Sequence, residues 1–424
     1  MAVQVRSEYE LLRQRCHERL LQDGRLQDVP PEERAGAIEA LVTQYLYEFR
    51  ASLSRAERTQ LITEIQQDVL GYGPITPLLE DESITEIMVN GPEQVYVERD
   101  GRLILTGLRF RDEEHVRRVI DRIVSPLGRR IDESSPMVDA RLPDGSRVNA
   151  IIPPISLVGP VLTVRKFVRR RLDSDELVRL GAMTEPMVEF LRLAVIGKLN
   201  ILVSGGTSSG KTTILNMLSA FIPHDERIIT IEDTAELQLQ HPHWIRLETR
   251  PPNIEGKGEI TARDLVRNAL RMRPDRIIVG EVRGAEAFEM IQAMNTGHEG
   301  GMSTIHANTA EDALIKVANY MRYTGMDLST EVINAQIAAA LHLVVHVHRF
   351  PDGSRKVVRI TSVVGSRGEE VITRPVWEFR REPNGAGGEV VGRHVCVGGS
   401  HLVEVLAERG IAVPARLFEE GGSA

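Results

Sequence analysis

The segment from Gly205 to Thr212, Gly-Gly-Thr-Ser-Ser-Gly-Lys-Thr, restricts the fold of this chain more than any other feature. It fits the pattern GxxxxGK[ST] and lies between an apolar run at 200–204 and a helical stripe that begins at Ile214. Glycines in such a loop let backbone N–H groups surround a phosphate, and the following helix adds a partial positive charge. We therefore predict a strand, a phosphate-binding loop and a helix in an α/β domain that binds a nucleoside triphosphate.

Individual residues of this loop have distinct expected roles. Lys211 should bridge the β- and γ-phosphates, and Thr212 should ligate Mg²⁺ through its hydroxyl, because a small hard cation prefers oxygen ligands. A glycine-rich turn without a ligand is the alternative, and it is disfavoured because both flanking elements are present. The predicted nucleotide-binding residues are Gly205, Gly206, Thr207, Ser208, Ser209, Gly210, Lys211, Thr212 and Thr213.

Two acidic clusters follow apolar runs further along the chain. Glu232, Asp233 and Glu236 follow one run, and Glu281 follows another. Ligands of open α/β sheets bind at the carboxyl ends of the strands, so we expect these carboxylates to hold Mg²⁺, with Glu281 as a ligand, and to orient water. Gly280 stands where many P-loop enzymes carry an aspartate, and the pattern leaves open which carboxylate is the base. Exposed acids at a helix start are the alternative for the first cluster.

Several arginines lie between the acidic clusters, and five of them are candidates for arginine fingers that act on a neighbouring subunit's nucleotide. Arg246 and Arg250 are the preferred candidates. Arg267, Arg271 and Arg273 fall on a predicted helix and fit its solvated face equally well.

Histidines form two further groups. His298 and His306 are eight residues apart and lack the HExxH spacing, so a polar loop beside the nucleotide fits better than a zinc site. His342, His346 and His348 lie on one face of a predicted strand, where surface positions are favoured over a metal site.

Periodicity divides the chain into five segments. We predict a bundle of three amphipathic helices at 1–70, an α+β domain with two hairpins at 71–167, a linker at 168–176, an α/β domain at 177–365 and an unassigned extension at 366–424.

Composition argues against a basic nucleic-acid-binding protein and against a membrane-spanning protein. A net charge of −8 argues against a generally basic nucleic-acid binder, and no apolar stretch is long enough to span a membrane. Cys16 and Cys396 form no CxxC pair, which favours a reducing compartment. A cytoplasmic protein that reaches a membrane only through partners is expected.

Four motifs together resemble the type II/IV secretion ATPase superfamily, and within it the CpaF/TadA branch that powers Tad/Flp pilus assembly. The resemblance extends over about residues 62–365, and the chain lacks the tetracysteine zinc module of many relatives, as on the CpaF and type IV secretion side. The motifs are Gly-Gly-Thr-Ser-Ser-Gly-Lys-Thr-Thr at 205–213, Ile-Glu-Asp-Thr-Ala-Glu at 231–236, Arg-Pro-Asp-Arg-Ile-Ile-Val-Gly-Glu-Val-Arg-Gly at 273–284 and Ser-Thr-Ile-His-Ala-Asn at 303–308.

The resemblance implies a RecA-like P-loop ATPase domain preceded by a helical segment and a small α+β, PAS-like domain that closes over the nucleotide. It assigns Lys211 and Thr212 to the Walker A motif, 232–236 to the Asp box, Glu281 to the Walker B glutamate and 298–306 to the His box. It further implies ATP and Mg²⁺ as cofactors, a homo-hexamer, partner proteins of the TadB/TadC kind in an inner-membrane platform, and peripheral attachment at the inner face of the cytoplasmic membrane. No nucleic-acid partner is expected, because the net charge is acidic and aromatic residues are scarce.

Three other functions stay open at this stage. They are a type IV secretion ATPase, a RecA-like nucleic-acid translocase, and a nucleotide-dependent scaffold that does not hydrolyse ATP.

Overall fold

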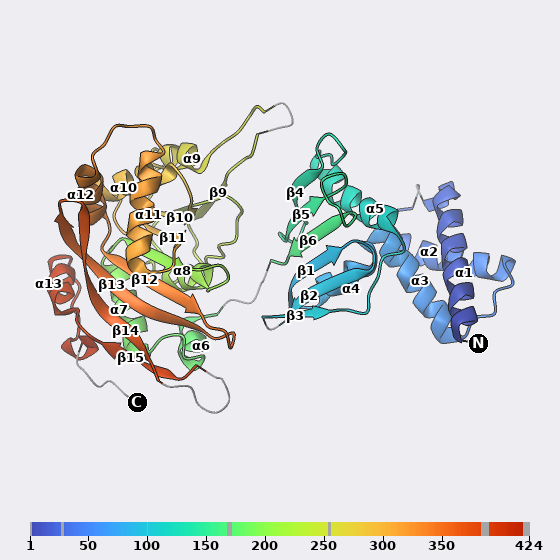
Figure 1. The fold of residues 1–424 in the computed structure, drawn as a ribbon, viewed down its shortest axis with the longest axis horizontal. Helices are drawn as coiled ribbons and strands as arrows, with labels where there is room; N and C mark the ends of the chain where they lie inside the picture. The colour runs from blue at the N-terminus through green and yellow to red at the C-terminus, as the bar shows by residue number, and fades with distance from the viewer. Residues whose placement is uncertain are drawn as a thin grey trace. The chain divides into compact units, whose positions relative to one another are not determined.

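The chain forms two compact units that divide at Arg169 and Arg170 (Figure 1). The computed structural model describes residues 2–26, 29–99, 101–167, 172–252, 256–382 and 390–418. The division falls within the expected linker, of which 168–171 lie outside the described residues.

The first unit begins with three helices, α1 (Ala2–Gln22), α2 (Arg34–Glu48) and α3 (Arg55–Leu70). Their facing stripes bury a common core that includes Cys16, Ile38 and Ile65. Ser54 caps α3, because its side chain accepts from the Glu57 N–H and the Glu57 carboxylate accepts from the Ser54 N–H.

A six-stranded antiparallel sheet follows, in the order β3-β2-β1-β6-β5-β4. The two expected hairpins form as β2–β3 and β4–β5, although Asp100 of the first turn lies outside the described residues. His115 Nε2 on α5 lies 3.2 Å from Asp68 Oδ1 on α3, and both side chains are buried, so the bundle and this sheet belong to one compact unit. The elements are η2 (Gly73–Ile75), α4 (Thr76–Glu80), β1 (Ile84–Asn90), β2 (Gln94–Arg99), β3 (Arg102–Leu105), α5 (Glu113–Val124), β4 (Met137–Arg141), β5 (Arg147–Ile151) and β6 (Val161–Arg165).

The second unit is built on a nine-stranded sheet in the order β15-β14-β13-β12-β7-β11-β10-β8-β9 (Figure 1). Strands β7 to β12 are parallel, and β13 to β15 add to the β12 edge in antiparallel fashion. One face packs on α7, α8 and α13, and the other on α9 to α12. Parallel strands with helices on both faces are the expected α/β layering.

These elements position the site described below. Their bounds are α6 (Ser174–Arg179), α7 (Glu185–Ile196), β7 (Ile201–Gly205), α8 (Lys211–Ser219), β8 (Ile228–Glu232), β9 (Trp244–Glu248), α9 (Ala262–Ala269), β10 (Arg276–Val282), α10 (Glu286–Asn295), β11 (Met302–His306), α11 (Ala310–Arg322), α12 (Thr330–Ala340), β12 (Leu343–Arg349), β13 (Arg355–Arg367), β14 (Glu370–Arg381), β15 (Gly392–Cys396) and α13 (Ser400–Glu408).

The carboxyl-terminal segment is part of the second unit, and the expected boundary at 365 falls inside β13. Phe190 on α7 contacts the rings of Trp377 on β14 and Phe418, with ring centroids 5.0 and 5.5 Å apart. The sequence motifs end before this segment, and its strand pairing and ring contacts assign it to this unit.

No helix among the described residues combines the length and the apolar character needed to cross a membrane.

Candidate nucleotide site

The phosphate loop leaves the sheet at Gly205, where the strands β7 and β12 lie too close for a side chain. A Cβ at Gly205 would stand 2.4 Å from the Val347 carbonyl oxygen and 2.5 Å from Ser209 Oγ. Ser208 and Gly210 have φ of 55° and 101°, conformations that turn the chain sharply before α8 begins. The strand, loop and helix predicted from the motif are therefore all present.

Polar contacts hold this loop in a closed curve. Lys211 Nζ donates to the carbonyl oxygens of Gly205 and Gly206 at 3.2 and 2.9 Å, and Ser209 Oγ donates to Gly206 O at 2.9 Å. From outside, Arg355 Nε on β13 donates to Ser208 O at 2.9 Å. The loop surrounds Lys211 and leads directly into the amino terminus of α8. Backbone N–H groups, a lysine and a helix amino terminus are the hydrogen-bond donors that a triphosphate requires. Thr212, in the first turn of α8, offers the hydroxyl that Mg²⁺ would need.

Glu232 ends β8 as a buried carboxylate with an exposed fraction of 5%. Its Oε2 accepts from the N–H groups of Glu236 and Leu237 at 2.7 and 2.8 Å, while Oε1 is buried and accepts no hydrogen bond within the described residues. Burial raises the pKa of this carboxyl above its ordinary value, although the two backbone hydrogen bonds act in the opposite direction. A desolvated carboxylate with one unused oxygen has the character of a general base.

Gly280 on the neighbouring strand β10 makes room for this side chain, because a Cβ there would stand 2.8 Å from Glu232 Cγ. Its own carbonyl oxygen accepts from Thr304 Oγ1 on β11 at 2.7 Å. A steric constraint therefore explains why glycine occupies the position where many P-loop enzymes carry an aspartate.

Arg283, to which the sequence motifs assigned no role, contacts both Glu281 and Asp233. Arg283 donates from one terminal nitrogen to Glu281 Oε2 at 2.6 Å, and its other terminal nitrogen lies 3.7 Å from Asp233 Oδ2. Glu286 in turn accepts from the Arg283 N–H at 2.6 Å. Arg283 lies two residues after Glu281 inside the Gly-Glu-Val-Arg-Gly motif, and this position is the sequence signal that could have identified it as a site residue.

His306 ends β11, directly beside Gly205 in the sheet register. Burial lowers the pKa of His306, and the positive charges of Lys211 and Lys316 lower it further. Lys316 Nζ donates to His306 O at 2.8 Å, and the Ala307 N–H donates to Gly205 O at 3.2 Å. The structure thus brings His306 next to the phosphate loop.

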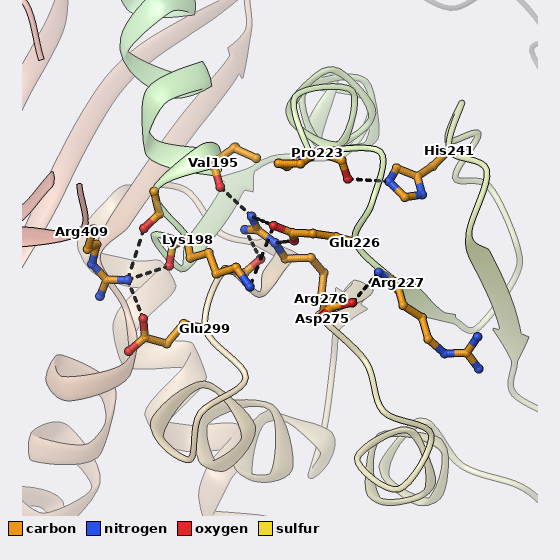
Figure 2. A network of polar contacts seen from close by, with 12 residues as sticks. Val195, Lys198, Pro223, Glu226, Arg227, His241, Asp275, Arg276, Glu299 and Arg409 are labelled. Carbon is orange, nitrogen blue, oxygen red and sulfur yellow. Dashed lines mark hydrogen bonds and ion pairs between the residues drawn. The ribbon is translucent and has the colours of Figure 1, made fainter. Parts of the chain in front are cut away.

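His298 is not brought to this edge of the sheet. It lies in the turn before β11, so the full length of that strand, roughly 3.3 Å per residue, separates it from His306. Its neighbour Glu299 belongs to a polar network at the opposite, amino-terminal edge, where it accepts from Arg409 (Figure 2). The eight-residue spacing suggested one loop, whereas the intervening residues form a strand that places the two histidines at opposite ends.

Arg246 and Arg250 likewise do not reach the phosphate loop of their own chain. Arg246 lies on the edge strand β9 over the ring of Trp244, 4.8 Å from its centroid. Arg250 donates from Nε to Gly258 O at 2.7 Å in the following loop. Both side chains are exposed, and so are Arg267, Arg271 and Arg273 on and just after α9.

The expectation of surface positions for His342 and His346 is wrong. His346 is 5% exposed and its Nδ1 lies 2.9 Å from Ser204 Oγ, and the half-buried His342 accepts at Nδ1 from the Asn200 N–H at 3.0 Å. Only His348 of the three is exposed. His346 is buried where β12 pairs with β7, and His342 lies between Asn200 and Arg409, contacts that the pattern of the strand alone did not predict.

A phosphate loop at the carboxyl edge of a parallel sheet, with buried and paired carboxylates on neighbouring strands, defines a P-loop protein with a RecA-like ATPase fold. The crystal structure of the pilus retraction motor PilT with bound ADP has this fold. It aligns with a TM-score of 0.50 and 19% identity over 80% of this chain and 86% of that chain.

The family model for the type II/IV secretion system protein matches residues 68–372, and the chain belongs to this family. The putative conjugal transfer protein Rv3659c of Mycobacterium tuberculosis is 37% identical over 75% of this chain and 91% of its own length. The type IV secretion system protein VirB11 of Brucella suis is 33% identical over 65% of this chain and 84% of its own length.

Proposed function

We propose that this protein is an ATPase whose hydrolysis of Mg-ATP drives a membrane-embedded type IV secretion machine. The single observation that carries the proposal is the pairing of the phosphate loop with the buried Glu232, whose Oε1 is unused, at the same edge of the sheet. A binding module needs the loop alone, and a hydrolase also needs a group that takes a proton from water.

Each residue of the site has a role in this proposal. Lys211 would neutralise phosphate charge, and Thr212 and Glu281 would hold Mg²⁺, whose charge would polarise the γ-phosphoryl group of ATP. Glu232 accepts a proton at Oε1 and keeps its orientation through the two backbone N–H groups on Oε2. Arg283 keeps Glu281 and Asp233 together, and His306 contributes a polar ring beside the loop.

Assembly is also part of the proposal. A homo-hexamer would let the exposed Arg246 and Arg250 approach the nucleotide of an adjacent copy, since neither reaches the loop of its own chain. The force-bearing partner would be an integral membrane protein of the secretion machine, with this chain attached to its cytoplasmic side.

Two candidate machines remain. The relatives named for conjugal transfer and type IV secretion favour a type IV secretion apparatus. The motifs that resemble the CpaF/TadA branch favour a Tad/Flp pilus platform with TadB/TadC-like proteins, which is the second candidate.

Steady-state ATP hydrolysis by the purified full chain tests the ATPase proposal. Wild-type protein should turn over Mg-ATP and Lys211→Ala should not, while both keep the same melting temperature without nucleotide. Equal rates would refute the proposal, and tight binding without turnover would favour the scaffold alternative. Rates should not respond to single-stranded DNA, and a strong, salt-dependent stimulation would favour a nucleic-acid translocase.

Two further experiments address assembly and machine. The mass in solution with a non-hydrolysable ATP analogue should be that of a hexamer, and a strict monomer would refute the arginine contact between copies. Co-purification from membranes should recover type IV secretion components, whereas recovery of pilus platform proteins would favour the second candidate.

A further inference from the structure

His346 lies directly behind the phosphate loop, on the sheet face opposite α8. In the parallel register, His346 pairs with Ser204, and the next residue, Val347, pairs with Gly205. Ser204 is fully buried and its Oγ lies 2.9 Å from His346 Nδ1. This hydrogen bond therefore involves Ser204, the last residue before the phosphate loop begins at Gly205.

The same ring also contacts the segment that follows β11. The ring and Asn308, two residues after His306, line the same cavity, and a hydrogen bond with the Asn308 backbone acts to raise the pKa of the ring. Ala307, between them, already donates its N–H to Gly205 O at 3.2 Å. His346 thus connects the two segments that border the phosphate position, one ending at Ser204 and the other passing through His306 to Asn308.

A neutral ring suits this geometry, because neutral imidazole has one donor and one acceptor nitrogen for two different partners. Burial and the nearby His348 lower the pKa of His346 to about 4, although Glu311 and Asp312 on α11 act in the opposite direction. A cavity of about 450 Å³, lined by residues that include His346, His348 and Arg359, lies next to the ring.

We propose that His346 is a positioning residue for nucleotide turnover, which holds the Ser204 end of β7 and the His306–Asn308 segment at a fixed separation. The inference rests on the proposed ATPase activity and adds a residue that touches no nucleotide. Without this contact, the Ser204 end of β7 and the His306–Asn308 segment can shift relative to each other, so that Lys211 and His306 no longer keep a fixed relative position. Misplacement of a reacting group by about 1 Å can lower a rate roughly a hundredfold.

Kinetics of the full-length protein test this inference through kcat and nucleotide affinity measured separately. His346→Leu, which has neither donor nor acceptor, should lower kcat roughly tenfold, as loss of a supporting residue commonly does. Affinity for ADP should change less than about twofold, because the loop itself remains. His346→Gln keeps one donor and one acceptor and should restore most of kcat.

A matched control and a double variant separate positioning from general packing. His348→Leu makes the same change two residues along β12 at an exposed position and should leave kcat unchanged. Ser204→Ala should also lower kcat, and its combination with His346→Leu should add little, because both variants remove the same Ser204–His346 hydrogen bond.

Two outcomes would overturn the inference: a kcat of His346→Leu equal to that of the wild type, or losses that multiply in the double variant. If His346→Leu does not fold, Ser204→Ala decides alone, and an unchanged kcat refutes the inference. A wild type without ATPase activity would instead refute the proposed function, so the two failures are distinguishable.

Discussion

The Glu232 side chain occupies the space beside Gly280, where a Cβ would stand only 2.8 Å from Glu232 Cγ. The two residues come from adjacent parallel strands, β8 and β10, paired up to Ile231 and Val279. A carboxylate from one strand therefore fills the position that a side chain on the other would need. The glycine at 280 therefore leaves room for the glutamate from the neighbouring strand.

Gly280→Ala should impair the site without contacting nucleotide. The added methyl group must displace Glu232, so we expect kcat to fall roughly ten- to a hundredfold and the free energy of unfolding to fall by about 1–3 kcal/mol. ATP hydrolysis and chemical unfolding measure the two effects. Gly36→Ala on α2, where a Cβ meets nothing within 4 Å, is the control and should leave kcat unchanged. A fully active Gly280→Ala protein would mean that Glu232 need not lie where it does.

Glu232→Gln tests whether this residue is the base. Glutamine can still accept from the N–H groups of Glu236 and Leu237, so we expect binding of ADP to persist while kcat falls by a factor of about 10² to 10⁴. Glu248→Gln, at the paired position on β9, is the matched control and should keep wild-type kcat. If Glu232→Gln hydrolyses ATP normally, Glu281 becomes the candidate base.

The pH profile gives an independent check on the same residue. A base must be ionised to act, and burial raises the pKa of Glu232, so the carboxyl stays protonated to a higher pH than an ordinary glutamate. We expect kcat to decline on the acid side at a pH above the range of an ordinary carboxyl. A profile that stays flat down to the ordinary range would contradict this role.

Buried His346 should make the second unit less stable in mild acid. Its pKa is about 4 in the folded protein and 6.5 for an ordinary histidine, so between these values the unfolded chain binds more protons. The free energy of unfolding is unaffected by this group above pH of about 6.5 and decreases as the pH falls through this window. By pH 5 the decrease is about 2 kcal/mol. Both tryptophans, Trp244 and Trp377, lie in the second unit, so their fluorescence reports its unfolding. His346→Gln should lose less stability between pH 7 and pH 5, and an identical loss would contradict the prediction.

Arg276 is a fully buried cation at the amino-terminal edge of the sheet (Figure 2). It pairs with Glu226 and donates to Val195 O at 2.9 Å and Gly300 O at 3.3 Å. Arg276→Ala leaves the Glu226 carboxylate without its cation, which should lower the free energy of unfolding by about 3–5 kcal/mol in the tryptophan assay. Arg267→Ala removes an exposed guanidinium from α9 and should change stability by less than about 0.5 kcal/mol. Equal effects of the two changes would refute the structural role.

Arg409 attaches the carboxyl-terminal segment to this same edge. It donates to Gly197 O, Lys198 O and Glu299, and a terminal nitrogen lies 3.0 Å from His342 Nε2. Arg409→Ala should lower the free energy of unfolding by about 1–3 kcal/mol and expose the segment after β15 to proteases. Arg393→Ala, at an exposed position on β15, should do neither. Unchanged protease resistance of Arg409→Ala would show that ring packing at Phe418 is sufficient.

Local pattern was enough to predict much of the site. The GxxxxGK[ST] motif needs only its flanking strand and helix, and both form at β7 and α8. Glu232 and Glu281 follow apolar runs, and because parallel strands end at one edge, their gathering near the loop followed from the sequence.

Contacts between distant strands could not be predicted in this way. Arg283 acquires its role only because β8 and β10 are neighbours, which brings Asp233 within 3.7 Å. His346 looked like one of three alternating surface residues, and it is buried because β12 pairs with β7.

The sequence alone determined the elements and their local chemistry, since backbone conformation, capping and apolar periodicity act over a few residues. It placed Gly205 to Thr212 between a strand and a helix and an acid at the end of each apolar run. Only the tertiary structure decided which strands became neighbours, because this depends on hydrogen bonds and packing between residues far apart in the chain. That order placed Glu232 beside Gly280 and extended the sheet with β13 to β15.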